Sequence, residues 1–322
     1  MSSSGVDRAA LSEFEHGLNV RQPGQSRIPA RVLGYGEIST VLEIQSARAG
    51  NLAYKRMPMF RNEAEVTQYE ALYTEYVDVL QNRSGVQVVG GELIQVRGAK
   101  GKIVAYIAQE KLPPQSIAHR TLHGLPADEV LKVVQAVLRE TQKVFDFNRA
   151  HANELELGFD GQISNWAIVG FEAEAQRLPD AIRLVYLDTS TPLLRKGGRE
   201  QLNPELFLRS APFFLAWLLR LLYLDEVLTR YYDFRRVALD LVANFYKEQR
   251  ADLIPALIDL VNASFAAQDD RLKPLTAAEV AAYYQQDAQL WRAYLAARKV
   301  DRFLHRLIGK EYPYILPEQI KR

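Results

Sequence analysis

Apolar and polar positions alternate in short runs along the first third of the chain. Residues 31–44 and 51–60 are rich in β-branched and aromatic side chains and are separated by turn-prone residues, which predicts three antiparallel strands. Residues 62–81 have a helical period instead. The apolar positions that define it are three or four apart: Val66, Tyr69, Tyr73, Tyr76 and Leu80. Strand character returns at 86–96 and 101–112, so the predicted order is three strands, one helix and two strands.

Beyond residue 112 the apolar period becomes almost wholly helical. Residues 127–150 carry one long apolar stripe and predict a long helix. Two short strand-like runs interrupt this region, at 166–171 and 182–188, and more helices follow to about residue 265. The pattern predicts a small sheet followed by a mostly helical part.

Capping residues mark where some of the helices begin. Asn203 followed by Pro204 is a typical helix start, and Thr276 with Glu279 fits a capping box that opens a last long helix. At the two ends of the chain, residues 8–18 predict a short amphipathic helix and residues 312–322 predict irregular structure.

Composition narrows the classes of function. Forty basic and 39 acidic side chains give a net charge of +1, so we expect neither nucleic acid nor a membrane as partner. The absence of cysteine excludes disulfides, thiolate metal sites and a cysteine nucleophile. The apolar segment 211–224 is too short to span a bilayer and contains Arg220, so it predicts a buried helix. The first residues lack a secretory pattern, which makes the cytoplasm the expected location.

Two glycines and a lysine in the first three strands are candidates for phosphate binding. Gly34 and Gly36, in "GYGEIS", would let backbone N–H groups approach a phosphate without obstruction by a Cβ atom. An ordinary glycine-rich hairpin explains the same residues. Lys55, in "AYK", lies in the middle of the third strand and is either a phosphate ligand or a side chain that reaches solvent at a sheet edge.

Three polar residues in the middle of the chain have the chemistry of a metal site. Asp160 and Asn165 are five residues apart, just before a short apolar run, and Asp188 ends the next strand-like run. An acid that ends an apolar strand is costly to bury unless it is paired or bound to a metal, and magnesium is the natural partner. A plain Asp-Gly turn at Asp160 and a strand-end cap at Asp188 are the alternatives.

Together these residues and the order of the elements resemble the protein kinase-like superfamily, and most closely its small-molecule branch of aminoglycoside phosphotransferases and choline kinases. The resemblance covers about residues 31–265. It implies an α+β, two-lobed fold with a small antiparallel-sheet N-lobe, one inserted helix and a large helical C-lobe. The implied divisions are an N-terminal extension, the N-lobe, the C-lobe with the catalytic loop, and a C-terminal helical extension: 1–30, 31–111, 112–265 and 266–322.

The resemblance also implies a role for each candidate residue. Gly34, Gly36 and Ser39 would cover the phosphates of ATP, with Ser39 at the position of a third glycine, and Lys55 would hold the first phosphates. The hinge that meets adenine through its backbone would be "AQEKL", which contains the cofactor-binding candidates Gln109, Glu110 and Lys111. Asp160 would position the acceptor hydroxyl, and Asn165 and Asp188 would bind Mg²⁺.

In this fold a glutamate of the inserted helix orients the lysine, and helical geometry favours one candidate. Glu70 lies about 80° from the centre of the apolar stripe, whereas Glu75 lies about 140° away. Glu70 is therefore the expected partner of Lys55 and a catalytic candidate, with Glu65 and Glu75 as alternatives.

The chain departs from the family pattern around the catalytic aspartate. Gly158 and Phe159 replace the usual histidine-rich lead, and Thr189 and Ser190 follow Asp188 where a protein kinase has Phe-Gly. The candidate residues taken together lead us to expect an ATP- and Mg²⁺-dependent phosphotransferase that acts on a hydroxyl of a small metabolite. A pseudokinase with a protein partner and a kinase-like nucleotidyltransferase are the alternatives.

Three further groups of polar residues have weaker claims. Arg195, Lys196 and Arg199 form either an anion site or a solvated loop. His119 and His123 are four apart without a third ligand, so no zinc site is expected there. Ser164 is a turn former rather than a nucleophile.

Overall fold

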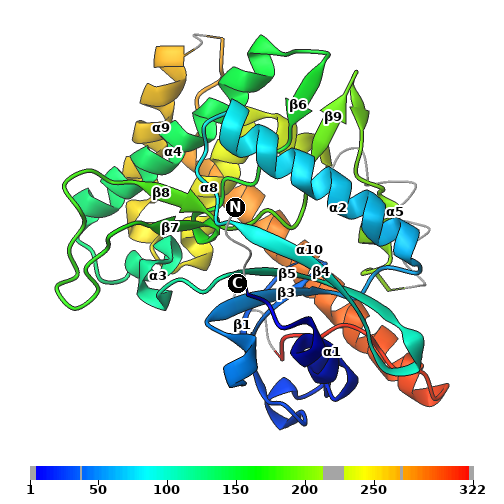
Figure 1. Cartoon of the computed structure of the whole chain (residues 1–322). Coiled ribbons are helices and arrows are strands. Elements are labelled where there is room, and N and C mark those ends of the chain that lie inside the picture. Colours follow the sequence, from blue (N-terminus) through cyan, green and yellow to red (C-terminus); the bar gives the residue numbers. More distant parts are fainter. Residues whose placement is uncertain (1–4, 37, 213–227, 269–270, 319–322) are drawn as a thin grey trace.

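A five-stranded antiparallel sheet forms the first part of the chain in the computed structural model, which describes residues 5–36, 38–212, 228–268 and 271–318 (Figure 1). The strands lie in the order β1-β2-β3-β5-β4. Their bounds are β1 (Ala30–Tyr35), β2 (Thr40–Ile44), β3 (Leu52–Met57), β4 (Gly91–Arg97) and β5 (Ile103–Glu110). The five strands predicted from the pattern are confirmed.

The helix predicted between the third and fourth strands is α2 (Glu63–Asp78), which a π-helical turn at Val79–Arg83 continues. The Asn62 side chain caps its first turn by accepting a hydrogen bond of 2.9 Å from the backbone N–H of Glu65. The residues of its buried face are Val66, Tyr69, Tyr73 and Tyr76. Tyrosines thus make up most of the surface that α2 presents to the rest of the molecule.

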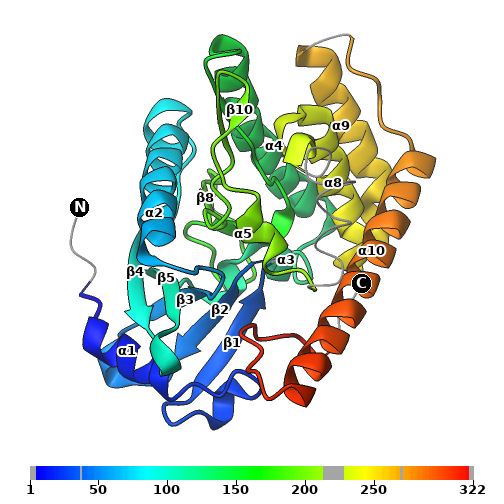
Figure 2. The ribbon, with the colours of Figure 1, turned by 90° about the vertical axis from the view of Figure 1, so that its right-hand side faces the viewer.

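Each face of the sheet packs against a different helix, as Figure 2 shows for α2 and for α1 (Arg8–His16). Ile103 and Ile107 of β5 share a core with α2, whereas Val104 and Tyr106 share a core with α1. Successive side chains of a strand point to opposite faces, which explains this division. The predicted N-terminal helix is confirmed, and it packs on the sheet.

A buried ion pair ties α1 and the C-terminal tail to the sheet. Arg56 of β3 donates to both carboxylate oxygens of Glu15, at 2.8 and 2.6 Å, and the Tyr106 hydroxyl donates to the same carboxylate. Arg56 also donates to the backbone carbonyl of Pro313 at 2.7 Å. Only 3% of the Arg56 side chain and 5% of the Glu15 side chain are exposed, so water contributes little to either charge.

The second part of the chain is mostly helical. Its described helices are α3 (Ala118–Thr121), α4 (Ala127–Ala150), α5 (Glu205–Leu208), α8 (Phe234–Lys247), α9 (Ile254–Gln268) and α10 (Ala277–Leu307). Its short strands are β6 (Leu155–Leu157), β7 (Trp166–Ile168), β8 (Leu184–Tyr186), β9 (Leu194–Lys196) and β10 (Arg199–Glu200). β7 pairs with β8, and β6 pairs with β9. The expected helix at 211–224 lies outside the described residues from position 213 onward.

The predicted last long helix is α10, which runs along the side of the molecule from α8 towards the sheet (Figure 2). The Thr276 hydroxyl caps it at the backbone N–H of Glu279, at 3.2 Å. The Glu279 carboxylate does not complete the capping box, because it pairs with Arg235 at 2.6 Å. After α10 the chain is irregular, as predicted, but Tyr314 and Ile315 are buried in the sheet's cores.

A small antiparallel sheet followed by a helical part is compatible with a kinase-like fold. Every helix within the described ranges is too short or too polar to traverse a membrane.

Candidate functional site

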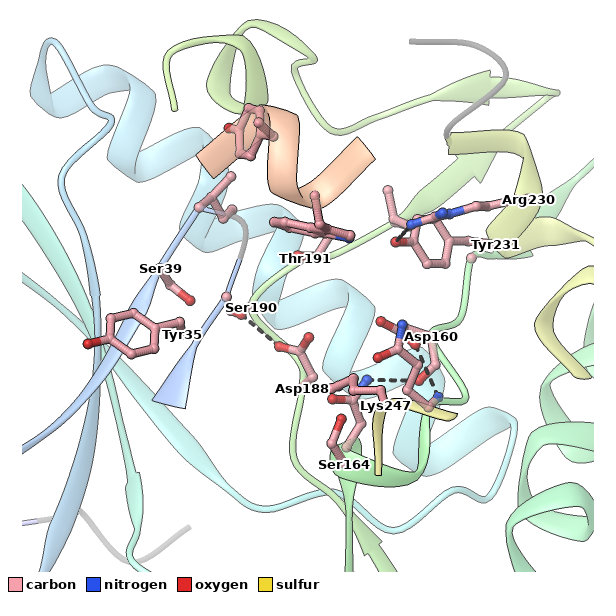
Figure 3. A pocket seen from close by; sticks show the side chains of 18 of the residues that line it. Tyr35, Ser39, Asp160, Ser164, Asp188, Ser190, Thr191, Arg230, Tyr231 and Lys247 are labelled. Carbon is pink, nitrogen blue, oxygen red and sulfur yellow. Dashed lines mark hydrogen bonds between the residues drawn. The ribbon is translucent and has the colours of Figure 1, made fainter. Parts of the chain in front are cut away.

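A pocket of about 360 Å³ opens between the sheet and the helical part (Figure 3). Gly36 and Ser39 line it from the β1–β2 turn, and Asp188 lines it from the segment after β8. Asp160 and Asn165 line it from the loop between β6 and β7. These five residues are up to 152 positions apart in the chain and meet in one cavity.

The segment from Asp160 to Asn165 is a compact loop whose ends are tied together. The Asn165 amide nitrogen donates to the Asp160 backbone carbonyl at 3.2 Å, and the Tyr186 hydroxyl donates to that carbonyl at 3.1 Å. The flanking strands β6 and β7 pair with different strands, so this is not the turn of a hairpin. The spacing of five residues is the length that lets the amide close the loop.

Gly158 explains part of the unusual lead into this loop. A Cβ atom at that position would stand 2.7 Å from Leu193 Cβ and 2.9 Å from the Tyr232 ring. Phe159, which follows, is buried against Trp166 and Tyr186, with ring centroids 5.8 and 4.6 Å away. Gly158 and Phe159 thus meet packing requirements of this chain.

The Asp160 carboxyl has an unusual protonation equilibrium. Burial, with the neighbouring carboxylates Asp240 and Asp188, raises its pKa from 3.8 to about 7. The Gln162 backbone N–H donates to Asp160 Oδ1 at 3.1 Å and opposes part of this increase. A carboxyl with this pKa can accept a proton near neutral pH and release it again.

Asp188 is held in the charged form by its neighbours. Burial acts to raise its pKa, but Lys55 and the Ser190 hydroxyl outweigh burial, so the pKa of Asp188 lies below its ordinary value. Lys55 Nζ lies 3.2 Å from Asp188 Oδ1, and Ser190 Oγ donates to the same oxygen at 2.8 Å (Figure 3 shows the second contact). Lys55 also donates to the Leu187 carbonyl at 2.6 Å.

The expected contact between Lys55 and Glu70 is not formed, so this prediction was wrong. Glu70 is exposed on α2, and Lys55 takes Asp188 as its carboxylate partner. The alternatives are also engaged elsewhere, because Glu65 pairs with Arg209 at 2.6 Å and Glu75 pairs with Lys196 at 2.7 Å. None of the three glutamates that the sequence offered lies against Lys55.

Tyrosines of α2 contact the loop and the strand end that carry the acids. Tyr76 Oη donates to the Gly158 carbonyl at 3.1 Å, and Tyr69 Oη donates to the Ser190 carbonyl at 2.7 Å. The sequence pattern indicates these side chains only as an apolar stripe. Their hydroxyls link α2 to backbone within two residues of both Asp160 and Asp188.

Besides Lys55 and Glu70, four more of the candidate residues lie outside the lining of this pocket. Gly34 is part of β1, and Glu110 is exposed at the end of β5. Gln109 is buried, with Nε2 3.4 Å from both the Val89 carbonyl and Thr189 Oγ1. Lys111 forms an ion pair with Glu43. The structure therefore brings Gly36, Ser39, Asp160, Asn165 and Asp188 together and leaves the expected hinge apart from them.

The pocket is also lined by residues that no pattern in the sequence indicates. Arg230 and Tyr231 precede α8, and Lys247 ends it. Trp291 and Arg298 come from α10, and two residues of the tail, Ile315 and Pro317, complete this wall. No motif marks these positions, because they are single polar or aromatic residues within helices and irregular segments.

The weaker polar groups have structural contacts. Arg195 lies over the Tyr232 ring at 3.9 Å and 3.7 Å from Glu200, so it is part of the packing around β9. Burial lowers the pKa of His119 to about 4, with the nearby cations contributing. Ser164 lines the pocket beside Asn165.

The donor set suits a hard divalent cation. Asn165 uses its amide nitrogen towards Asp160, which leaves the amide oxygen as the metal-facing atom, and Asp188 has a second carboxylate oxygen beside the one that Lys55 contacts. Oxygen ligands of this kind fit Mg²⁺, which keeps several of its waters. Among the described residues, no group of three or more acids and histidines is placed to hold a metal, so an ion here would rest on these two side chains.

Comparisons with known proteins give one clear assignment. No curated protein matches the chain. Among solved structures, "WaaP in complex with acyl carrier protein" is similar over 72% of this chain and 89% of that chain, at 13% identity and a TM-score of 0.32, which does not by itself establish a common fold. Residues 20–302 match the family described as "Family of unknown function (DUF6206)". The chain therefore belongs to the DUF6206 family.

Proposed function

We propose that this protein is an ATP- and Mg²⁺-dependent phosphotransferase that acts on a hydroxyl group of a small metabolite. One observation carries the proposal: Asp160, Asn165 and Asp188 line the same pocket as the Gly36–Ser39 turn. Their chemistry is that which phosphoryl transfer from ATP requires, and their order along the chain is that of the kinase-like pattern.

The proposal divides the chain into two lobes around this pocket. Residues 31–111 would form the N-lobe and 112–265 the C-lobe, with 1–30 and 266–322 as extensions. The contacts of Arg56 with Glu15 and Pro313 support a view in which both extensions brace the N-lobe. The residues of α10 and the tail that line the pocket would form part of the acceptor side.

Asp160 would act on the acceptor. Its carboxylate would take the proton from the acceptor hydroxyl while the hydroxyl oxygen attacks the γ-phosphorus of ATP, the bond to the bridging oxygen breaks, and ADP leaves. The pKa of about 7 matches this role, because both protonation states of Asp160 are accessible near neutral pH.

Asn165, Asp188 and Lys55 would hold the triphosphate. Asn165 and Asp188 would bind Mg²⁺, which supplies positive charge against the phosphate oxygens. Lys55 lies 3.2 Å from Asp188, so its ammonium group would contact the same phosphates. Gly36 and Ser39 would cover them from the β1–β2 turn.

A pseudokinase is the second candidate, and one observation favours it. Lys55 is already bound by Asp188 and by the Leu187 carbonyl, and no glutamate of α2 orients it. If Lys55 kept its contacts with Asp188 and the Leu187 carbonyl, the protein would bind protein partners without transferring phosphate.

Thermal unfolding with and without ATP and Mg²⁺ tests the proposal. Nucleotide at 100 times its Kd adds about 2.7 kcal/mol of stability, which raises the melting temperature by a few degrees. Asp188→Asn should lose the part of the increase that depends on Mg²⁺, whereas Asp252→Asn, at an exposed position with its own arginine partner, should keep it. No increase in the wild type at saturating nucleotide would support the pseudokinase instead.

The mass of the product separates the remaining alternative. Phosphoryl transfer adds a phosphate group to the acceptor, and nucleotidyl transfer adds AMP. A screen of hydroxyl-bearing metabolites by mass spectrometry, with Asp160→Asn as the inactive control, distinguishes the two products directly.

A further inference from the structure

The last turns of α10 expose apolar side chains on the surface of the protein. Seven large apolar side chains are exposed among the described residues, and four of them lie within nine positions here: Val300, Phe303, Leu307 and Ile308. Beyond Asp301 none of the residues of α10 is buried. The helix end lies at the periphery of the molecule, beside the C-terminal tail (Figures 1 and 2).

Three of these side chains form one stripe. At about 100° per residue, Val300, Phe303 and Leu307 fall within about 60° of one another. The accessible fractions of the seven exposed apolar residues range from 41% to 66%, and Leu307 has the highest value. Isolated apolar residues on a surface need no explanation, but a contiguous stripe marks an interaction surface.

Basic residues border the stripe on one side. Lys299, Arg302 and Arg306 fall within about 100° of Phe303, on the side away from Val300. The only acid between residues 288 and 310 is Asp301, and it is buried 3.2 Å from His305. Among the described residues no ion pair is formed by Arg302 or Arg306, whereas Lys299 Nζ donates to the Glu318 backbone carbonyl at 2.5 Å. The cations therefore outnumber the acids at this edge, although Glu311 follows directly after it and the net charge of the chain is only +1.

We infer that the C-terminal end of α10 docks on the surface of an anionic phospholipid bilayer. An apolar stripe with a basic border is the pattern of a helix that lies in the membrane interface, with the apolar side chains among the acyl chains and the cations at the headgroups. A helix end at the periphery of the molecule can lie against a lipid surface, whereas a partner protein would need a matching groove. The inference concerns a peripheral contact and does not depend on phosphoryl transfer.

Docking would place the pocket near the bilayer. Arg298 lines the pocket, and Phe303 is five residues further along the same helix, which corresponds to about 7.5 Å of rise. The same helix thus connects the membrane contact to the wall of the candidate site.

Co-sedimentation of the full chain with vesicles tests the inference. One set of vesicles is phosphatidylcholine alone, and the other also contains phosphatidylglycerol. We expect the wild type to bind the anionic set and to release it at high salt, because screening weakens exposed charge interactions. Arg302→Gln with Arg306→Gln should lower partitioning about fivefold per residue. Phe303→Ser with Leu307→Ser should lower it at least tenfold.

Matched variants control for changes in charge and in exposed apolar area. Lys132→Gln with Arg199→Gln removes two exposed cations elsewhere, and Val169→Ser with Leu290→Ser removes two exposed apolar side chains elsewhere. Both controls should bind as the wild type does. Because all substituted side chains are accessible to solvent, the melting temperatures should stay unchanged.

Two outcomes would overturn the inference. A wild type that stays in solution with anionic vesicles would exclude the lipid surface and point to an acidic protein partner. The second outcome would come from sedimentation velocity. If the wild type self-associates, the Phe303→Ser and Leu307→Ser variant does not, and vesicles bind neither protein, the stripe forms contacts between copies of this chain.

Discussion

Lys55 Nζ lies 3.2 Å from Asp188 Oδ1, and this contact joins the middle of the sheet to the segment after β8. Only 8% of the Lys55 side chain is exposed, compared with 34% of Asp188, so the cation is the more deeply placed partner. The carboxylate therefore keeps one side open to the pocket while the lysine holds the other. The proposed nucleotide site depends on this arrangement rather than on a glutamate of α2.

Lys55→Met should weaken binding of ATP with Mg²⁺ by about 10- to 100-fold, because a hydrogen bond to a charged group contributes about 1.5–3 kcal/mol. Glu70→Gln serves as the control and should change the Kd by less than about twofold, within the scatter expected of an exposed substitution. Isothermal titration calorimetry measures both values. An equal loss in the two variants would show that α2 contributes a charge to the site after all.

Asp160→Asn should stabilise the protein above neutral pH. The pKa of Asp160 is raised from 3.8 to about 7 in the folded state, so between these values the folded state binds more protons than the unfolded state. Stability from this group therefore falls as the pH rises from about 4 to about 7. The variant lacks this loss, so its melting temperature should exceed that of the wild type at pH 8 and match it near pH 4.

Asp252→Asn is the control for that experiment. Hydrogen bonding to Arg250 lowers the pKa of Asp252, so its charge favours folding and the variant should gain nothing at pH 8. If Asp160→Asn also gained nothing at pH 8, the carboxyl would not be protonated near pH 7 in the folded protein, and its proposed role as a base would need another explanation.

Arg56→Met should cost about 3–5 kcal/mol of unfolding free energy, because it leaves the Glu15 charge buried without its partner. Arg97→Met removes the exposed pair with Glu63, whose side chains are 62% and 55% accessible, and should cost about 1 kcal/mol or less. Urea unfolding at equilibrium gives both values. Similar costs would mean that the buried pair contributes no more than a surface contact.

Gly158→Ala should cost about 1–3 kcal/mol, since the added methyl group would meet Leu193 and the Tyr232 ring at less than 3.0 Å. Gly90→Ala has no atom within 4 Å of the new Cβ and should be neutral or slightly stabilising. The same urea titrations test the pair. A neutral Gly158→Ala would show that the loop before Asp160 has room to move.

Most of the fold could be predicted from the spacing of apolar residues and from helix caps. The apolar stripe of α4 predicted its bounds at 127–150, and Thr276 located the start of α10, because both signals are local. The spacing of Asp160 and Asn165 is also a local signal, since the loop that joins them is closed by a contact within the same six residues.

Features that depend on contacts between distant segments could not be predicted from the sequence. The angular choice of Glu70 treated α2 as an isolated helix, but Tyr69 and Tyr76 direct their hydroxyls to backbone carbonyls more than 80 positions away. That packing leaves Glu70 in solvent. The buried tail at Tyr314 and the cations at Arg230 and Lys247 gave no signal, because irregular backbone and single residues have no period to detect.

The contacts of Arg56 with Glu15 and with Pro313 become possible at different times during synthesis. Its first partner, Glu15, precedes it by 41 residues, whereas Pro313 follows it by 257. At about 5–20 residues per second, translation separates β3 from its second partner by roughly 10–50 s. During that interval the nascent sheet can pair Arg56 with α1 but cannot yet acquire the pocket wall at Ile315 and Pro317. Ile315 and Pro317 are therefore the last lining residues of the cavity to be synthesised.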